Sequence, residues 1–296
     1  MADVAARANK QKLSRAKTSQ LYEVWKRLMK NKTAVLGLCV IIVLILTAIF
    51  AEQIAPYGYD EQNYRQVFTS PCKEYWMGTD NLGRDILSRV VYGSRISLQV
   101  GLISVGIAAG VGVVLGLLAG FYGHLLDDIL MRILDIVFAI PEMLLAISIA
   151  ATLGDGLVNL MIAVGISNIP RYARVTRSAA LSVKGQEYIE AARAIGASDL
   201  HIIFRYVLPN CMAPIIVQIT MGVASSILSA SALSFIGLGI QPPIPEWGAM
   251  LSAGRDYMRD HWYVVTFPGL MIMITVYALN LFGDGLRDAL DPRLKN

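Results

Sequence analysis

The strongest constraint on the fold is a set of long runs without charged residues. Residues 33–51 hold no charged side chain in 19 positions, and residues 96–123 and 262–283 are also uncharged throughout. A helix rises about 1.5 Å per residue, so a run of this length spans roughly the 30 Å hydrocarbon layer of a bilayer. The chain is 55% hydrophobic and only 16% charged, whereas a soluble domain carries about 25% charged residues. We therefore predict an integral membrane protein.

Three more spans are expected in two longer stretches. Residues 206–245 are uncharged for 40 positions, but the prolines near their end cannot continue a helix, so they leave one span. Residues 133–172 must hold two helices, because Gly154-Asp155-Gly156 interrupts a longer apolar region. The predicted fold is therefore all-α, with six transmembrane helices. The predicted spans are 33–51, about 97–121, 133–153, 157–176, 212–236 and 263–284.

The distribution of Lys and Arg orients these spans. Nine basic and two acidic residues precede the first span, so the positive-inside rule places the leader, residues 1–32, in the cytoplasm. A second basic segment, residues 177–211, follows the fourth span, whereas residues 52–95 have five basic and six acidic residues and are assigned to the outside. Both termini, including the tail 289–296, are then cytoplasmic. A cleaved signal peptide is the alternative for the first span, but its apolar run exceeds the usual length of about 7–15 residues.

The end of the leader has the pattern of an amphipathic helix. Apolar residues recur at helical spacing while lysines occupy other positions. These apolar residues are Leu21, Val24, Trp25 and Leu28. We expect residues 21–32 to lie on the inner membrane surface. For residues 1–18 a disordered basic tail is the alternative.

Composition also limits the cofactors and partners of the chain. Three cysteines and three histidines are scattered, without the spacing of a metal site or of a full disulfide set. The net charge of +4 reflects the basic leader, so nucleic acid is not an expected partner. No G-x-x-x-x-G-K-[ST] motif is present to hold a nucleotide. We expect no cofactor, no metal and no catalytic residue.

The segment between the fourth and fifth predicted spans has the pattern of a helical hairpin. Residues 186–195 are rich in good helix formers and end at Gly196, which suits a left-handed helix cap. Ser198 or Asp199 can cap a second helix, which is expected to end at Pro209. On composition alone, this could be any cytoplasmic hairpin.

The hairpin contains Glu190-Ala191-Ala192, then Gly196 after three residues, and Leu208-Pro209 after eleven more. This pattern resembles the EAA loop of permease subunits from binding-protein-dependent ABC importers. The family loop ends in I-x-L-P, and this chain has Tyr206, also a large apolar side chain, at the isoleucine position. The loop lies between the spans where the family has it.

Further motifs extend the resemblance over nearly the whole chain. They are similar to those of the second permease subunit of dipeptide, oligopeptide and nickel importers. They are Pro56-Tyr57 and the stretches 77–85, 92–98, 234–239, 242–243, 246–248 and 283–293. The resemblance implies a type I ABC importer permease fold in the bacterial cytoplasmic membrane, with the ABC permease domain at residues 96–288.

The resemblance also implies how the hairpin works. The implied partners are a homologous permease, two ATPase subunits and an external solute-binding protein, with ATP hydrolysis on the ATPases. A short helix docked in a cleft of an ATPase transmits movement by side-chain packing. Ala191 and Ala192 would permit close approach, and a bulky residue at Ala192 would block docking. Glu190 would offer a carboxylate to a basic partner, and Gly196 would set the angle between the two arms.

Two features inside the spans are candidates for function. Gly112, Gly116 and Gly120 lie four residues apart, a spacing that lets helices approach closely in lipid. Glu142 is an acidic residue inside a predicted span, next to Pro141, which should bend the helix. Asp135 is assigned instead to a charge cluster with Asp128 and Arg132 at helical spacing. Glu142 is therefore the candidate for the translocation path.

Other functions fit the sequence less well. An intramembrane protease would need a motif such as G-x-S-x-G or H-E-x-x-H, and neither is present. A secondary transporter would show two halves of similar hydropathy, and the first span with its long external loop has no counterpart. A scaffold without transport would leave the hairpin without a purpose. The substrate stays open among short peptides, nickel and glutathione, with peptides favoured because no cluster of His, Cys or carboxylates marks a metal path.

Overall fold

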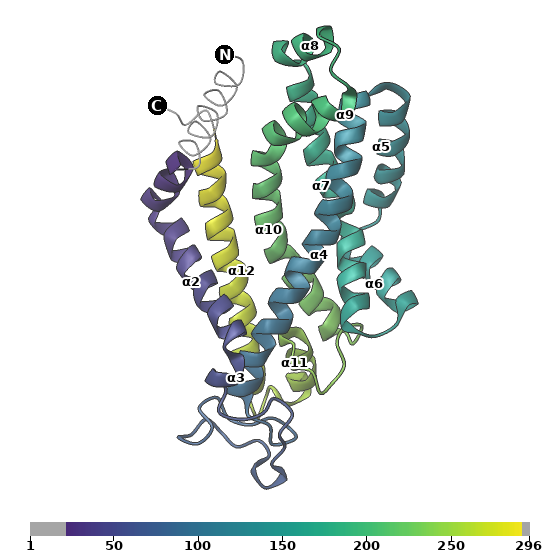
Figure 1. Cartoon of the computed structure of the whole chain (residues 1–296). Helices are drawn as coiled ribbons and strands as arrows, with labels where there is room; N and C mark the ends of the chain where they lie inside the picture. Colours follow the sequence, from purple (N-terminus) through teal and green to yellow (C-terminus); the bar gives the residue numbers. More distant parts are fainter. Residues whose placement is uncertain (1–21, 292–296) are drawn as a thin grey trace.

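The computed structural model describes residues 22–291, and these residues contain helices but no β-strand, which confirms the all-α class. The long elements are α2 (Lys32–Ile49), α4 (Ile86–Tyr122), α5 (His124–Ala139), α6 (Glu142–Leu153), α7 (Leu157–Lys184), α10 (Leu208–Phe235) and α12 (Tyr263–Leu290). The short ones are α3 (Ala51–Ile54), η1 (Tyr64–Gln66), α8 (Glu187–Ala194), α9 (Asp199–Ile202), η2 (Ile203–Val207), α11 (Trp247–Gly254) and η3 (Arg255–Tyr257). Figure 1 shows α8 at one end of the molecule and the loops that precede α4 at the other.

Four helices within residues 22–291 are long and apolar enough to cross a membrane. They are α2, α4, the continuous stretch from α9 to α10, and α12, and the bent pair α5–α6 would supply a fifth span. α7 is not among them because Asn168, Pro170 and arginines interrupt its apolar sequence. The count of six spans and the cytoplasmic placement of the termini stay predictions. The start of α2 and the end of α12 lie at the same end of the molecule as α8 (Figure 1).

The predicted span 133–153 is not a single helix. α5 ends at Ala139 and α6 begins at Glu142, and the two helices meet at an angle of 88°. Pro141 explains the break, since it has no N–H to donate and it disfavours helical geometry at Ile140. Ile140 is indeed extended, with φ −82° and ψ 127°. The sequence predicts a local bend within one helix at Pro141, whereas the structure has two separate helices at a sharp angle.

The prediction that the second arm of the hairpin ends at Pro209 is wrong, because the helix continues into α10. α9, η2 and α10 form one continuous helical stretch, in which η2 is a π-helical turn just before Pro209. Pro209 lies in the first turn of α10. A proline is tolerated there because the wider hydrogen-bond register of the π turn changes which N–H groups need a carbonyl partner. Asp199 to Phe235 therefore form one element of membrane-spanning length.

α2 and α12 run side by side as an outer pair (Figure 1). A Cβ at Gly37 of α2 would lie 2.6 Å from the Ala278 carbonyl oxygen, and one at Gly285 of α12 would lie 2.2 Å from Ala34. Residues 22–30 are helical and precede α2, and Leu28 packs on Ala34 and Ala289. On the predicted amphipathic face, Trp25 is exposed and Leu21 lies outside the described residues.

The end of the molecule opposite α8 is closed by polar loops. Arg84 Nε lies 2.7 Å from Asp80 Oδ2 in a buried ion pair, and Asp85 caps α4 by accepting from the Ser88 N–H. Glu246, also buried, caps α11 by accepting from the N–H groups of Gly248 (2.9 Å) and Ala249 (2.8 Å). Burial raises the pKa of Glu246, and these hydrogen bonds oppose the rise. These contacts are local, whereas Arg89 joins loops far apart in sequence by donating to the carbonyls of Tyr59 (2.8 Å) and Pro243 (3.3 Å).

Candidate functional site

The hairpin at residues 187–202 is held in shape by a glycine cap. The N–H of Gly196 donates to the Arg193 carbonyl (2.9 Å), and the N–H of Ala197 donates to the Ala192 carbonyl (3.1 Å). This pair of bonds is a Schellman motif, which needs a residue in the left-handed conformation directly after the helix cap. Gly196 supplies it with φ +81°. The predicted turn between the two arms therefore has its physical basis in this residue.

The inner face of α8 fixes the hairpin to the membrane helices. Ile189 and Ala192 are buried in a cluster that includes Leu117 and Phe121 of α4. The expectation that Ala192 faces an ATPase is therefore wrong, because its side chain is only 6% exposed and packs on this chain's own core. Residues 189 and 192 are three apart and so share one helix face. Ala191 is exposed on the other side.

The outer face of the hairpin is apolar. We call Tyr188, Ala191, Ile195, Leu200 and Phe204 the outer stripe; all five are exposed. The first three follow at i, i+3 and i+7, so they form one line along α8 and its cap. Ile195 is 84% exposed, and Glu190, which precedes Ala191 in the sequence, is exposed as well. A large apolar surface of this kind marks an interaction site when it faces water.

Leu208 and Pro209 do not belong to the outer stripe. Leu208 is partly buried and packs on the same cluster as Ile189, and Pro209 is exposed at the start of α10. Their position, directly after the π-helical turn, sets where the hairpin leaves the membrane helix.

The glycine ladder of α4 faces α7. A Cβ at Gly112 would lie 2.6 Å from Tyr172 Cβ, and one at Gly116 would lie 2.4 Å from the Ala173 carbonyl oxygen. At Gly120 the nearest atom would be Ala180 Cβ, at 2.7 Å. No larger residue fits at these positions without moving a helix. The ladder therefore sets the distance between α4 and α7.

Two ion pairs tie α5 to α7. Arg177 binds Asp127 through two bonds, with Nε–Oδ1 at 2.5 Å and Nη2–Oδ2 at 2.6 Å. Arg174 Nη2 lies 2.6 Å from Asp135 Oδ1. Asp135 thus pairs across to α7, and the expected cluster with Asp128 and Arg132 does not form an ion pair.

Glu142 lies where three helices meet. Its Oε1 accepts from Asn168 Nδ2 of α7 (2.9 Å) and from Ser229 Oγ of α10 (3.3 Å). The Glu142 side chain is nevertheless exposed on the surface of this subunit. A carboxylate at the N-terminus of α6 is also favoured by the helix dipole.

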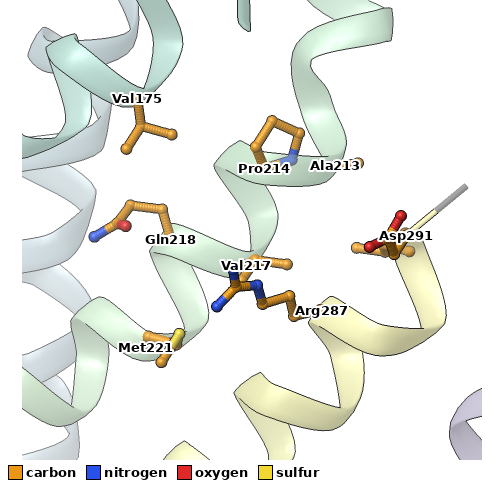
Figure 2. Close-up of a pocket in the computed structure, with 9 residues that line it drawn as sticks. Val175, Ala213, Pro214, Val217, Gln218, Met221, Arg287 and Asp291 are labelled. Carbon is orange, nitrogen blue, oxygen red and sulfur yellow. The ribbon is translucent and has the colours of Figure 1, made fainter. Parts of the chain in front are cut away.

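A cavity of about 390 Å³ opens between α7, α10 and α12 (Figure 2). Its α10 and α12 residues belong to the first part of α10 and the last part of α12, which lie toward the end of the molecule that carries α8 (Figure 1). Its wall is largely apolar, with Val175, Val217 and Met221, and Arg287 extends into this region from α12. Gln218 also faces it, and its buried Nε2 has no partner among the described residues. The volume falls within the range of small-molecule sites, about 300–1,000 Å³.

Sequence reasoning missed several of these residues. The predicted fourth span ends at residue 176, which places Arg177 in a cytoplasmic segment, although Arg174 and Arg177 are three residues apart and lie on one side of a helix that continues to Lys184. Asn168 and Ser229 gave no signal, because single polar residues inside apolar runs are common. The helical spacing of Leu200, Ile203, Phe204 and Val207 predicts a single apolar face for the second arm, but only Ile203 and Val207 are buried.

The chain is similar to known transport proteins. Residues 112–296 match the family described as binding-protein-dependent transport system inner membrane component, and residues 19–71 match the N-terminal transmembrane domain of oligopeptide transport permease C. The di/tripeptide transport system permease protein DppC of Pseudomonas aeruginosa is 48% identical over 284 residues, which is 94% of each chain. The glutathione transport system permease protein GsiD of Escherichia coli is 48% identical, over 93% of this chain and 91% of its own.

A solved structure shares the fold. A chain of the MetNI methionine ABC transporter, in an inward-facing conformation, superposes with a TM-score of 0.56 at 20% identity. The match covers 69% of the present chain and 96% of that one.

Proposed function

Because the chain belongs to the family of binding-protein-dependent transport system inner membrane components, we propose that it is a permease subunit of an ATP-driven importer of short peptides. The single observation that carries the substrate class is the 48% identity over 94% of both chains to a permease named for di- and tripeptides. ATP hydrolysis takes place on separate ATPase subunits. Glutathione, itself a short peptide, is the second candidate, because GsiD permeases are equally similar.

The outer stripe supports the assignment of the hairpin to energy coupling. Its apolar side chains project from the end of the molecule where the basic segments of the sequence place the cytoplasm. The inner face of the same helix is rigidly packed on α4 through Ile189 and Ala192. An ATPase bound to the outer stripe would therefore move α4 and α10 with it rather than swing a loose tether.

The complex is proposed to contain one further permease, homologous to this chain, two ATPase subunits and an external solute-binding protein, in a bacterial cytoplasmic membrane with six spans per permease. Gly112, Gly116 and Gly120 pack against α7 of the same subunit. The apolar outer surfaces of the long helices remain for lipid and for the second permease.

Docking at the outer stripe is tested by Ile195→Asp, with Ile195→Val as the matched control. Ile195 is 84% exposed, so neither change should disturb the fold of the subunit. A buried charge at the docking surface should weaken binding of the ATPases at least tenfold, as measured by co-purification with tagged permease at graded ATPase concentrations. Equal recovery of ATPase with both variants would contradict docking at this surface.

The substrate class is tested by titrating the cognate solute-binding protein with a labelled dipeptide, with glutathione and with Ni²⁺. We expect the tightest binding for a di- or tripeptide. Preferential binding of Ni²⁺ would contradict the proposal, and preference for glutathione would favour the second candidate.

A further inference from the structure

Glu142 is an exposed carboxylate at the depth of the membrane interior. It is the first of the 12 residues of α6, which ends near the turn at residues 154–156. At about 1.5 Å per residue, Glu142 lies roughly 18 Å from that turn, near the middle of the hydrocarbon layer. The hydrogen bonds from Asn168 and Ser229 both end on Oε1, which leaves Oε2 without a partner among the described residues. A carboxylate at this depth must face water, protein or a ligand rather than lipid.

The bend between α5 and α6 points to the same conclusion. No side chain caps the N-terminus of α6, and the N–H groups of a first helical turn have no partner inside the helix. Unpaired backbone groups of this kind are tolerated at membrane depth only where they line a water-filled space or are covered by protein. The surface at Glu142 is therefore not a lipid-facing surface.

Arg171 is an unpaired cation one helical turn from this site. Of the three arginines on α7, Arg174 and Arg177 bind carboxylates of α5. Arg171 is exposed and makes no ion pair or hydrogen bond within residues 22–291. It follows Asn168, the partner of Glu142, by three residues, so its Cα is about 4.5 Å further along the axis and on a neighbouring part of the helix surface.

We infer that Glu142 and Arg171 hold the two charged ends of a peptide in transit, the α-ammonium at Glu142 Oε2 and the α-carboxylate at Arg171. This inference rests on the proposed function and adds a substrate site to it. An extended dipeptide spans about 7 Å. This exceeds the axial separation of Asn168 and Arg171, about 4.5 Å, by an amount within the reach of an arginine side chain. Arginine suits the carboxylate because its planar guanidinium can bind both oxygens.

Residues of this site and residues of the cavity share the same sides of α7 and α10. Gln218 precedes Ser229 by 11 residues, close to three helical turns, so both lie on one side of α10. Val175 follows Asn168 by seven residues and shares its side of α7. Both Gln218 and Val175 line the cavity (Figure 2). The cavity therefore lies along the same sides of α7 and α10 as the site, nearer to the end that carries α8, and Arg287 is in its wall.

The test uses the full complex in proteoliposomes, with binding protein, ATP and a labelled dipeptide. Glu142→Gln keeps an oxygen that accepts from Asn168 and Ser229 but removes the charge, and Arg171→Gln removes the cation. Glu142→Asp keeps the charge. The matched controls are Asp155→Asn in the loop after α6 and Arg132→Gln on α5, which has no ion pair among the described residues. Uptake and ATP hydrolysis stimulated by loaded binding protein are measured together.

We expect both Gln variants to lower dipeptide uptake at least tenfold while stimulated ATP hydrolysis stays within twofold of wild type. Glu142→Asp and both controls should retain more than half of the uptake. Normal uptake by either Gln variant overturns the inference, as does a parallel loss of uptake and stimulated hydrolysis, which would indicate a structural or coupling role. If the wild-type complex itself imports no dipeptide, the proposed function fails instead.

Discussion

At the scale of single residues, neighbours in the sequence have opposite roles in the hairpin. Ala191 is exposed and Ala192 is buried, although both belong to the same short motif. The motif could be identified from the sequence, but which alanine is buried could not. α8 has only eight residues, and its orientation depends on its packing against α4. Gly196, in contrast, could be assigned from the sequence, since its cap depends on local backbone geometry alone.

Replacing each alanine by tryptophan separates these roles. Ala192→Trp should destabilise the subunit by about 1–3 kcal/mol, because the side chain must enter a filled cluster. Ala191→Trp should leave stability unchanged and weaken ATPase binding. Thermal unfolding of the purified subunit in detergent, followed by ATPase co-purification, distinguishes the two. Equal destabilisation by both changes would contradict the orientation of α8.

Gly196→Ala tests the left-handed cap. No atom lies within 4 Å of a Cβ at this position, so the cost comes from backbone conformation alone. We expect a loss of about 1 kcal/mol in the stability of the hairpin, seen as faster proteolysis at residues 186–202. Gly185→Ala is the control, because its surroundings are equally open and its φ is −81°. Equal proteolysis of the two variants would show that the cap does not limit hairpin stability.

Glu246→Gln tests the buried cap of α11. Both carboxylate oxygens accept backbone N–H bonds, so the amide NH₂ of glutamine must face a donor. The expected cost is about 1–3 kcal/mol of unfolding free energy. Glu52→Gln is the control, because Glu52 has only an exposed ion pair with Arg95 and should change stability by less than about 1 kcal/mol. Similar unfolding midpoints for both variants would argue against the cap.

At the scale of elements, two prolines differ in whether they break the helix. Pro141 separates α5 from α6 by an 88° bend, whereas Pro209 lies inside a continuous helical stretch. The sequence predicts a break or bend at each, and the difference comes from the π-helical turn before Pro209, which has no sequence signature here. The apolar runs sufficed to predict that the long helices exist. They could not predict that α7 would carry its arginines along a continuous helix to Lys184, because tertiary ion pairs with α5 support that part.

The contact between α4 and α7 gives a prediction at this scale. Gly116→Ala places a Cβ 2.4 Å from the Ala173 carbonyl oxygen, so the two helices must separate. We expect a loss of about 1–3 kcal/mol in thermal unfolding experiments. Gly110→Ala, on the same helix, meets nothing within 4 Å and should be neutral or slightly stabilising. A larger loss of stability for Gly110→Ala than for Gly116→Ala would contradict the packing of α4 on α7.

At the scale of the whole molecule, the two ends differ in the way an importer requires. One end carries the hairpin and its outer stripe. At the other end Arg89 joins the loops before α4 to those before α11 by donating to the carbonyls of Tyr59 and Pro243. Between them lie Glu142, Arg171 and the cavity between α7, α10 and α12, which together make up the proposed path of the peptide.

Cysteine labelling tests the orientation of these two ends. Cys72 is exposed in the predicted external segment, Cys39 lies within α2 and Cys211 is buried. An impermeant thiol reagent added outside intact cells should label Cys72 alone. Labelling of Cys72 only after the cells are opened would reverse the proposed orientation.

The central claim, that this subunit carries peptides in a step driven by ATP, is tested most directly by uptake of labelled dipeptide into proteoliposomes that contain the complete complex. We predict uptake that requires both enclosed ATP and external binding protein and that is absent with a proton gradient alone. Uptake by the purified subunit driven by a proton gradient, without ATPase subunits, would contradict the account.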